Sequence, residues 1–238
     1  MTLVRRLPLA VALLLALSSA MSAPTGSAAG LIVTSQAITP YRTCTITATP
    51  ASTTAVIDAG VRQATATTNF GTSTTNSISS AAAANQRLYV RFDLTQCSPT
   101  IPSAATIRLA TLRQYMSAVP AACRTIDIFR STATWTEAAI TWNNQPFGTT
   151  LNNPASGTRT GSFNVGTPAG CQNQAAGYVV GATVTGDVAA FVSGTTNFGW
   201  MLRDDVEASA TTRTSTFSAK DLGTLAQAPQ LVITYTLP

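Results

Sequence analysis

The stretch TWTEAAITWNNQP, residues 134–146, gathers the kinds of side chain that bind sugars. Trp135 and Trp142 lie seven residues apart, with Glu137 between them. The apolar side of a pyranose ring can stack on such an aromatic plane while amides and carboxylates bind its hydroxyl groups. Trp142 is the better candidate of the two rings for ligand contact. The amides that would accompany it are Asn143, Asn144 and Gln145.

The alternative for these two tryptophans is structural. Each ring could close one end of a hydrophobic core and bury on the order of 200 Å². An uninterrupted strand would place residues seven apart on opposite sides, but the intervening Glu-Ala-Ala indicates a turn. Both rings could therefore lie on one rim, and the sequence leaves the two interpretations open.

Carboxylates are the second group that could do chemistry. Hydrolysis of a glycosidic bond needs two facing acids, and the chain has nine acidic residues in all. Asp93 and Asp127 have arginine neighbours on their predicted strands, which favours ion pairs at those positions. Histidine is absent and Lys220 is the only lysine, so a nucleophile activated by a base is not expected. The sequence therefore predicts a protein that is not an enzyme.

The turn RDDVEASA, residues 203–210, is the third group. It brings together Asp204, Asp205 and Glu207, and Ca²⁺ is bound by six to eight oxygens, mostly from carboxylates and carbonyls. A structural Ca²⁺ is thus a candidate, against the alternative of a solvated acidic turn. No other cofactor is expected.

A polar side of the predicted sheet is the fourth group, and it offers arginines, acids and aromatic rings on successive strands. Arginine supplies planar donors and aromatic rings supply stacking surfaces, so this side is a second candidate for binding a glycan. If the segment 31–50 covers it, the same residues would instead be buried ion pairs. The residues that share this outward parity are Tyr89, Arg91, Asp93, Arg113, Tyr115, Asp127 and Phe129.

The elements that must position these residues are short strands. RLYVRFDL and RTIDIFRST alternate apolar and polar residues, and about ten such runs recur between Gly, Pro, Asn and Ser residues. This pattern predicts an all-β protein, a jelly-roll-like antiparallel β-sandwich in a single domain. We expect RLYVRFDL and TIRLATLRQYM to pair as a hairpin. At most one short helix is expected, in TGDVAAFVSG, with Thr185 as its cap and Gly194 at its end.

The amino terminus has the order of a secretory signal. Arg5 and Arg6 precede an apolar run that ends at Leu17, which is too short to span a bilayer. We therefore expect a signal peptide over residues 1–29, an extended segment over 30–54 and the sandwich over 55–238. This organisation predicts a secreted, extracellular protein with no membrane insertion after cleavage, and we expect a monomer.

Charge and cysteine content narrow the partners and the compartment. The net charge of +5 includes Arg5 and Arg6, and the remaining basic residues are scattered, so nucleic acid is not an expected partner. Four cysteines in an exported chain without histidine favour two disulfides over a zinc site. The expected hairpin holds Cys97 and Cys123 at opposite ends of a strand of roughly 30 Å. We therefore favour the pairs Cys97–Cys171 and Cys44–Cys123.

Six segments, taken in order, carry a family resemblance: RLYVRFDL, TLRQYM, TWTEAAITWNNQP, DVAAFVSGTTNFGWMLRDD, STFSAKD and PQLVITY. Together they resemble the DNRLRE domain, a group of extracellular β-sandwich modules that overlaps with family-96 carbohydrate-binding modules and disaggregatase-related modules. The resemblance covers residues 55–236. It departs from the family where an Arg-Glu pair usually follows the Ser-Ala stretch, because Lys220 and Asp221 stand there.

The resemblance implies a jelly-roll-like sandwich that serves as a surface or carbohydrate-binding module, with no binding residues to carry over. The leading hypothesis is a secreted, non-catalytic module that binds a polysaccharide or cell-wall glycan. One competing hypothesis is a structural or adhesive surface protein that acts through protein contacts. The other is a small polysaccharide-active enzyme, which would need two facing carboxylates in a cleft.

Overall fold

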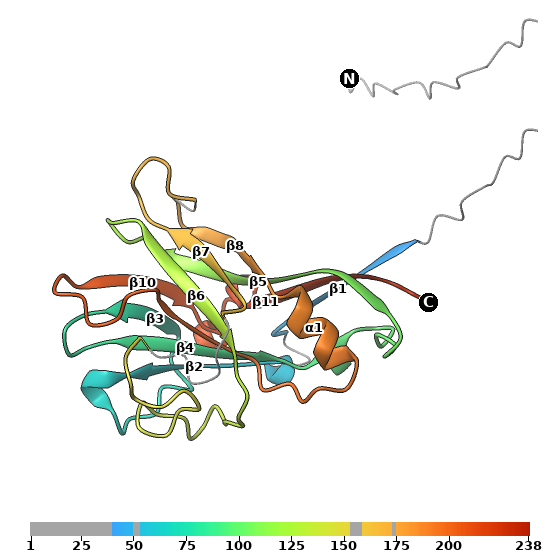
Figure 1. Cartoon of the computed structure of the whole chain (residues 1–238), viewed down its shortest axis with the longest axis horizontal. Helices are drawn as coiled ribbons and strands as arrows, with labels where there is room; N and C mark the ends of the chain where they lie inside the picture. Colours follow the sequence, from blue (N-terminus) through green and yellow to red (C-terminus); the bar gives the residue numbers. More distant parts are fainter. Residues whose placement is uncertain (1–39, 50–52, 153–158, 173–174) are drawn as a thin grey trace, which may run out of the picture. The chain divides into compact units, whose positions relative to one another are not determined.

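Strands form in this chain where apolar and polar residues alternate, because successive side chains of a strand point to opposite sides. The computed structural model describes residues 40–238 apart from 50–52, 153–158 and 173–174 (Figure 1). The expected leader, 1–29, lies outside the described residues. The strands are β1 (Tyr41–Thr47), β2 (Val56–Arg62), β3 (Thr75–Ser80), β4 (Gln86–Phe92), β5 (Thr106–Ala118), β6 (Arg124–Arg130), β7 (Gly161–Val165), β8 (Gly177–Thr183), β9 (Trp200–Asp204), β10 (Arg213–Ser218) and β11 (Gln230–Thr236).

The helical elements are few and short. The α-helix α1 spans Thr185–Val192 and lies between β8 and β9 in the chain. The other helical elements of the described residues are 3₁₀ helices: η1 (Thr53–Ala55), η2 (Gln63–Thr65), η3 (Leu94–Gln96), η4 (Lys220–Leu222) and η5 (Leu225–Gln227). Across the described residues, no helix combines the length and the apolar character needed to cross a bilayer.

The strands form two packed layers, and all strand pairings are antiparallel. The first layer contains β1, β11, β5, β10 and β3, with β8 on the far side of β5. The second layer contains β4, β9, β6 and β7, with β2 beside β4. A single residue pair, Ser79 with Gln86, joins β3 to β4 and connects the layers. The expected all-β sandwich is confirmed.

The expected hairpin of RLYVRFDL with TIRLATLRQYM is wrong. These segments are β4 and β5, and they lie in different layers (Figure 1). The loop between them contains Pro99 and Pro102 and leads the chain from one layer to the other, whereas a hairpin turn would have kept both strands in one layer. β4 pairs with β2, β3 and β9, and β5 pairs with β11, β10 and β8.

The main hydrophobic core fills the space between the two layers. β5 contributes Leu112 and Met116, β4 contributes Leu88 and Val90, and α1 adds Phe191. The helix is therefore placed by the core, as its predicted apolar spacing indicated. The expected cap by Thr185 is not formed: its Oγ1 accepts a hydrogen bond from the backbone N–H of Ala110 at 3.0 Å, which ties the helix to β5 instead.

A second hydrophobic core lies on the outer side of the second layer. Tyr89, Phe129 and Met201 point outward from β4, β6 and β9, as strand parity predicts. The long segment between β6 and β7 folds back over them, and its aromatic residues complete the cluster. We call residues 131–151 the cover segment. The covering aromatic and aliphatic residues are Trp135, Ile140, Trp142 and Phe147.

Both predicted disulfide pairs are wrong, although two disulfides do form. Cys44 bonds to Cys97 with a Cα–Cα distance of 5.6 Å, and Cys123 bonds to Cys171 at 5.7 Å. The reason is the strand order. β6 pairs with β7 so that Arg124 faces Val165, which brings the residue before β6 close to the loop that follows β7. The first disulfide links β1, at the edge of the first layer, to the residue that follows η3, the short helix after β4.

Candidate functional site

The two tryptophans of the opening stretch are core residues. Trp135 is 5 % exposed and Trp142 is 3 % exposed, so neither ring offers a surface on which a sugar could stack. The Nε1–H of Trp135 donates a hydrogen bond to the carbonyl of Phe198 at 2.8 Å. The guanidinium of Arg87 lies over the Trp142 ring at 4.7 Å from its centroid. The structure thus places both rings in the core, which is one of the two interpretations that the sequence left open.

The polar residues that accompany the tryptophans hold the cover segment in place. Glu137 accepts a hydrogen bond from the backbone N–H of Asp58 at 2.9 Å. The Oδ1 of Asn144 accepts from the backbone N–H of Thr141, within the segment's own turn. Gln145 is buried, and its Oε1 accepts from the hydroxyl of Tyr89 at 3.0 Å and from Arg87.

Among the predicted sugar-binding amides, Asn143 alone has an exposed side chain and no side-chain hydrogen bond within the described part of the chain. Asn144 is exposed too, but its amide nitrogen donates to the carbonyl of Ala139. Asn144 and Trp135 both line a small pocket of about 200 Å³ in the cover segment, and Asn143 does not belong to its lining.

The acidic turn that was a candidate for Ca²⁺ is occupied by arginines. Asp204 and Asp205 both accept hydrogen bonds from the guanidinium of Arg124. Glu207 is buried and accepts from Arg87 at 2.7 and 3.0 Å. The acids of the turn point to two different cations of the protein, so their oxygens do not gather around one ion.

A different set of acids does converge. Ligand oxygens of Asp58, Glu137 and Asp221 lie within 4.8 Å of one another, and Lys220 forms ion pairs with Glu137 at 3.2 Å and Asp221 at 3.0 Å. Asp58 is only 2 % exposed, and none of the described pockets is lined by these acids. The cluster is therefore an ionic anchor for the cover segment, buried at Asp58, half-buried at Glu137 and exposed at Asp221.

Burial dominates the electrostatics of this anchor. Loss of hydration and, second to it, the negative charge of Glu137 raise the pKa of Asp58 to about 7, against a lowering effect of Lys220. The pKa of Glu137 is also raised, mainly by burial. The Oδ2 of Asp58 accepts from Asn76 Nδ2 at 2.9 Å, while its buried Oδ1 has no hydrogen-bond partner among the described residues. The negative form of Asp58 is thus costly in the folded protein.

The stability of the protein should therefore rise on mild acidification. A carboxyl whose pKa goes from 3.8 unfolded to about 7 folded binds its proton more tightly in the folded state, so its contribution is greatest at low pH and is lost as the pH rises through 7. We expect the free energy of unfolding to fall by about 2–4 kcal/mol between pH 5 and pH 8. Urea unfolding at a series of pH values measures this slope.

Asp58→Asn is the matched variant for this pH dependence. An amide at this position can still accept from Asn76 and can donate towards Glu137, so we expect a flatter slope and a more stable protein at pH 8. The raised pKa of Glu137 leaves a smaller slope of the same sign. Identical slopes for the wild type and Asp58→Asn would contradict the assignment of the pH dependence to Asp58.

The predicted polar side of the sheet is divided between two layers. Arg91 lies on β4 and Arg113 on β5, so their shared parity places them on opposite outer sides of the sandwich. Tyr89 and Phe129 lie under the cover segment, whereas β1, within the 31–50 segment, pairs with β11 in the first layer. Asp127 pairs with Arg159 at 2.9 Å rather than with a neighbouring strand's arginine.

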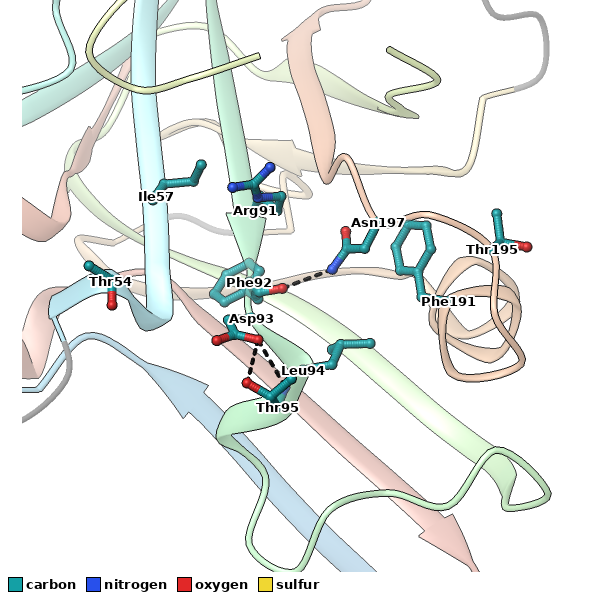
Figure 2. A pocket seen from close by; sticks show the side chains of 10 residues that line it. All are labelled: Thr54, Ile57, Arg91, Phe92, Asp93, Leu94, Thr95, Phe191, Thr195 and Asn197. Atoms are coloured by element: carbon teal, nitrogen blue, oxygen red, sulfur yellow. Dashed lines mark hydrogen bonds between the residues drawn. The ribbon is translucent and has the colours of Figure 1, made fainter. Parts of the chain in front are cut away.

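A pocket of about 500 Å³ lies at the end of β4, where Arg91 stands (Figure 2). We call it the Arg91 pocket. β2 contributes Ile57 to it, and the turn after α1 contributes Asn197. Its lining residues are Thr54, Ile57, Arg91, Phe92, Asp93, Leu94, Thr95, Phe191, Thr195 and Asn197.

The pocket is built on side chains that are themselves fixed. Asn197 donates from Nδ2 to the carbonyl of Phe92 at 2.8 Å and accepts from the N–H of Gly199 at 2.9 Å. Asp93 accepts from the N–H of Thr95 at 3.0 Å and from its hydroxyl at 2.7 Å. The hydrogen bonds of Asn197 and Asp93 fix the two turns that border the pocket.

Charge in the pocket is distributed between one anion and one cation. Partial burial raises the pKa of Asp93, but hydrogen bonds from Thr95 and Gln96 and the charge of Arg91 outweigh it and leave the pKa lowered. Asp93 is therefore an acceptor at neutral pH. The half-buried guanidinium of Arg91 makes no hydrogen bond or ion pair with any described residue. Its five N–H donors are available to a ligand.

The pocket thus offers what a polyhydroxylated ligand requires. Arg91 donates and Asp93 accepts, the hydroxyls of Thr54 and Thr195 can do either, and the hydroxyl of Thr95, which donates to Asp93, can accept. Ile57 and Leu94 add an apolar surface for C–H groups. Sequence analysis identified Arg91 and Asp93 as candidates through strand parity, but it missed Thr54, Thr195 and Asn197, which carry no pattern because the fold brings them from separate loops.

Comparison with known protein families gives a match to this chain. The family model described as carbohydrate-binding module family 96 matches residues 49–235, which is most of the chain. No match was found among curated proteins.

Proposed function

Because the chain belongs to carbohydrate-binding module family 96, we propose that it is a non-catalytic module that binds an extracellular polysaccharide in the Arg91 pocket. The observation that carries the assignment to this pocket is the guanidinium of Arg91. It lies in a pocket large enough for a sugar unit and, apart from its electrostatic attraction to Asp93, makes no hydrogen bond or ion pair in the described part of the chain. The planar guanidinium of an arginine can bind two neighbouring sugar hydroxyls or a carboxylate through two parallel hydrogen bonds.

Binding without catalysis is supported by the placement of the acids. Asp93 is the one acid that lines the Arg91 pocket, and hydrolysis of a glycosidic bond needs two. Asp58 and Glu137, which lie close together, belong to the ionic anchor of the cover segment, where Lys220 pairs with Glu137.

An extracellular site of action is supported by the two disulfides. Such bonds form and persist in oxidising compartments and are rare in the cytosol. A leader over residues 1–29 would bring the chain there, and it remains a proposal from the sequence. The adhesive alternative would need a large apolar patch. The well-exposed large apolar side chains of the described residues are Tyr41 on β1, Leu109 on β5 and Val206 in the loop after β9.

Arg91→Ala tests the pocket. We expect the variant to lose about 10- to 100-fold in affinity, because a hydrogen bond from a charged group contributes roughly 1.5–3 kcal/mol. Stability should change little, since the side chain is half-buried and bonded to no described residue. The measurement is affinity electrophoresis against soluble β-glucan, xylan, mannan, chitin oligomers and polygalacturonate, followed by calorimetry with the polymer that retards the wild type.

Arg42→Ala is the matched control, because it removes one exposed arginine from β1 and leaves the pocket intact. It should bind like the wild type. Arg91→Lys keeps the charge but loses the planar fork, so intermediate affinity is expected. Full affinity in Arg91→Ala would show that the polysaccharide binds elsewhere, and failure of the wild type with every polymer would overturn the proposed function for these classes.

A further inference from the structure

An aromatic surface lies on the outer side of the first layer, opposite the layer that carries the Arg91 pocket. Tyr115 on β5 and Tyr178 on β8 are direct partners across the strand pair. Arg113, also on β5, faces Gln230 on β11. All of these side chains are half-buried, in contrast to the buried tryptophans. We call these four residues the tyrosine surface.

The two tyrosine rings form a corner. Their centroids are 5.3 Å apart and their planes meet at 85°. Tyr178 reaches across β5, because its hydroxyl donates to the carbonyls of Ala226 and Ala228, which precede β11. Its ring therefore lies along the sheet, and the Tyr115 ring stands at a right angle to it.

The Tyr178 ring is held at its end and along one side. Gln230 Nε2 donates to its hydroxyl at 2.8 Å, and the Arg113 guanidinium lies over one face of the ring at 4.7 Å from the centroid. Arg113 is fixed in turn by a hydrogen bond from Nη1 to Gln230 Oε1 at 3.1 Å. A ring immobilised in this way loses little side-chain entropy when a ligand settles on it.

This arrangement matches the needs of a pyranose ring. The C–H groups on one side of a sugar carry partial positive charge and are attracted to the negative face of an aromatic ring. Two perpendicular rings can contact one side and one edge of the same sugar. The hydroxyl of Tyr115, which makes no hydrogen bond within the described residues, can then exchange a bond with a sugar hydroxyl.

We propose that the tyrosine surface is a second sugar-binding site, which takes one pyranose ring of a polysaccharide. The inference rests on the proposed function, and it adds a site on the opposite layer to the Arg91 pocket. Cross-strand aromatic pairs also stabilise sheets. That role alone does not require the Tyr178 ring to be held by Arg113, Gln230 and two backbone carbonyls while it is only half-buried. With two sites on opposite layers, one module can hold two polysaccharide chains or bind one long chain with added avidity.

NMR titration of the full chain tests the tyrosine surface directly. The probes are hexasaccharides of β-1,4-linked glucose, xylose, mannose and N-acetylglucosamine, together with hexagalacturonate. We expect the ring resonances of Tyr115 and Tyr178 to shift saturably with at least one probe, in the wild type and equally in Arg91→Ala. Tyr115→Ala should weaken binding at this surface by roughly tenfold, as loss of one aromatic contact predicts.

Two variants separate ring stacking from other effects. Tyr115→Phe keeps the ring and should retain most of the affinity. Tyr41→Ala removes a tyrosine that is 67 % exposed on β1, and it should leave the affinity at the tyrosine surface unchanged. Tyr178 is left intact because its hydrogen bonds also organise the approach to β11.

The outcomes distinguish this inference from the proposed function. Shifts of the Thr54 and Thr95 amides without shifts of the tyrosine rings would overturn the second site and leave the pocket standing. Shifts of the tyrosine rings alone would support the second site and overturn the pocket assignment. Unchanged spectra with all five probes would overturn both.

Discussion

Replacing Trp142 with alanine should lower the free energy of unfolding by about 3–5 kcal/mol, as truncation of large aromatic residues in cores does. The ring is 3 % exposed and belongs to the core between the second layer and the cover segment. Its removal leaves a cavity that the segment cannot fill, and it strips the Arg87 guanidinium of the aromatic face at 4.7 Å. The thermal midpoint should drop by roughly 6–20 °C for a chain of this size.

Thermal unfolding followed by circular dichroism measures this effect, with Asn143→Ala as the control. Asn143 is the exposed neighbour of Trp142, and its loss should change stability by less than about 0.5 kcal/mol. At temperatures where Trp142→Ala is folded, binding of polysaccharide should match the wild type, because the ring lines neither proposed site. A stable Trp142→Ala variant that fails to bind would restore the tryptophan as a ligand contact.

Arg87→Ala should be at least as destabilising, by about 3–5 kcal/mol, because it leaves a buried charge without its partner. Arg87 and Glu207 have fully buried side chains and are joined by bonds of 2.7 and 3.0 Å. Arg87 also donates to the carbonyls of Gly148 and Thr150 at 2.8 Å, so it fastens the end of the cover segment to the sheet. Loss of the Arg87 side chain removes these bonds to the cover segment and leaves the buried Glu207 carboxylate without its cation.

The double variant Arg87→Met, Glu207→Gln separates the effect of the unpaired buried charge from the effect of the lost bonds to the cover segment. It removes both charges and keeps much of the volume, so it should recover part of the stability that Arg87→Ala loses. Arg108→Ala is the control, since this exposed arginine makes one long hydrogen bond to Thr236 at 3.3 Å. Urea unfolding compares the three proteins. Equal stability of Arg87→Ala and Arg108→Ala would contradict the role assigned to the buried pair.

Side-chain alternation was sufficient to predict the class of fold. The runs in β4, β5 and β6 place their apolar residues on the inner side of each strand, as the sequence indicated. It was not sufficient to say which strands pair. The expected hairpin of β4 and β5 failed because the loop between them changes layer, and the predicted disulfides, which followed from that hairpin, failed with it.

The sequence predicted part of the candidate site, because alternation along a strand fixes the side on which each residue lies. Alternation correctly placed Tyr89, Arg91 and Arg113 on the outer sides of their strands. It could not show that the cover segment buries Tyr89, that Arg91 opens into a pocket, or that Arg113 supports a tyrosine ring on the other layer. The parity of a residue says which side of its own strand it occupies and nothing about what lies above that side.

The sequence by itself determined the all-β class, the presence of two disulfides and, through six ordered segments, the family to which the chain belongs. Only the tertiary structure decided that Trp135 and Trp142 are core residues and that the acids of the turn at 204–207 serve two arginines. Local pattern depends on neighbours in the chain, whereas burial and charge pairing depend on segments that meet across long loops. The contact between Glu137 and Asp58, 79 residues apart, is of this second kind.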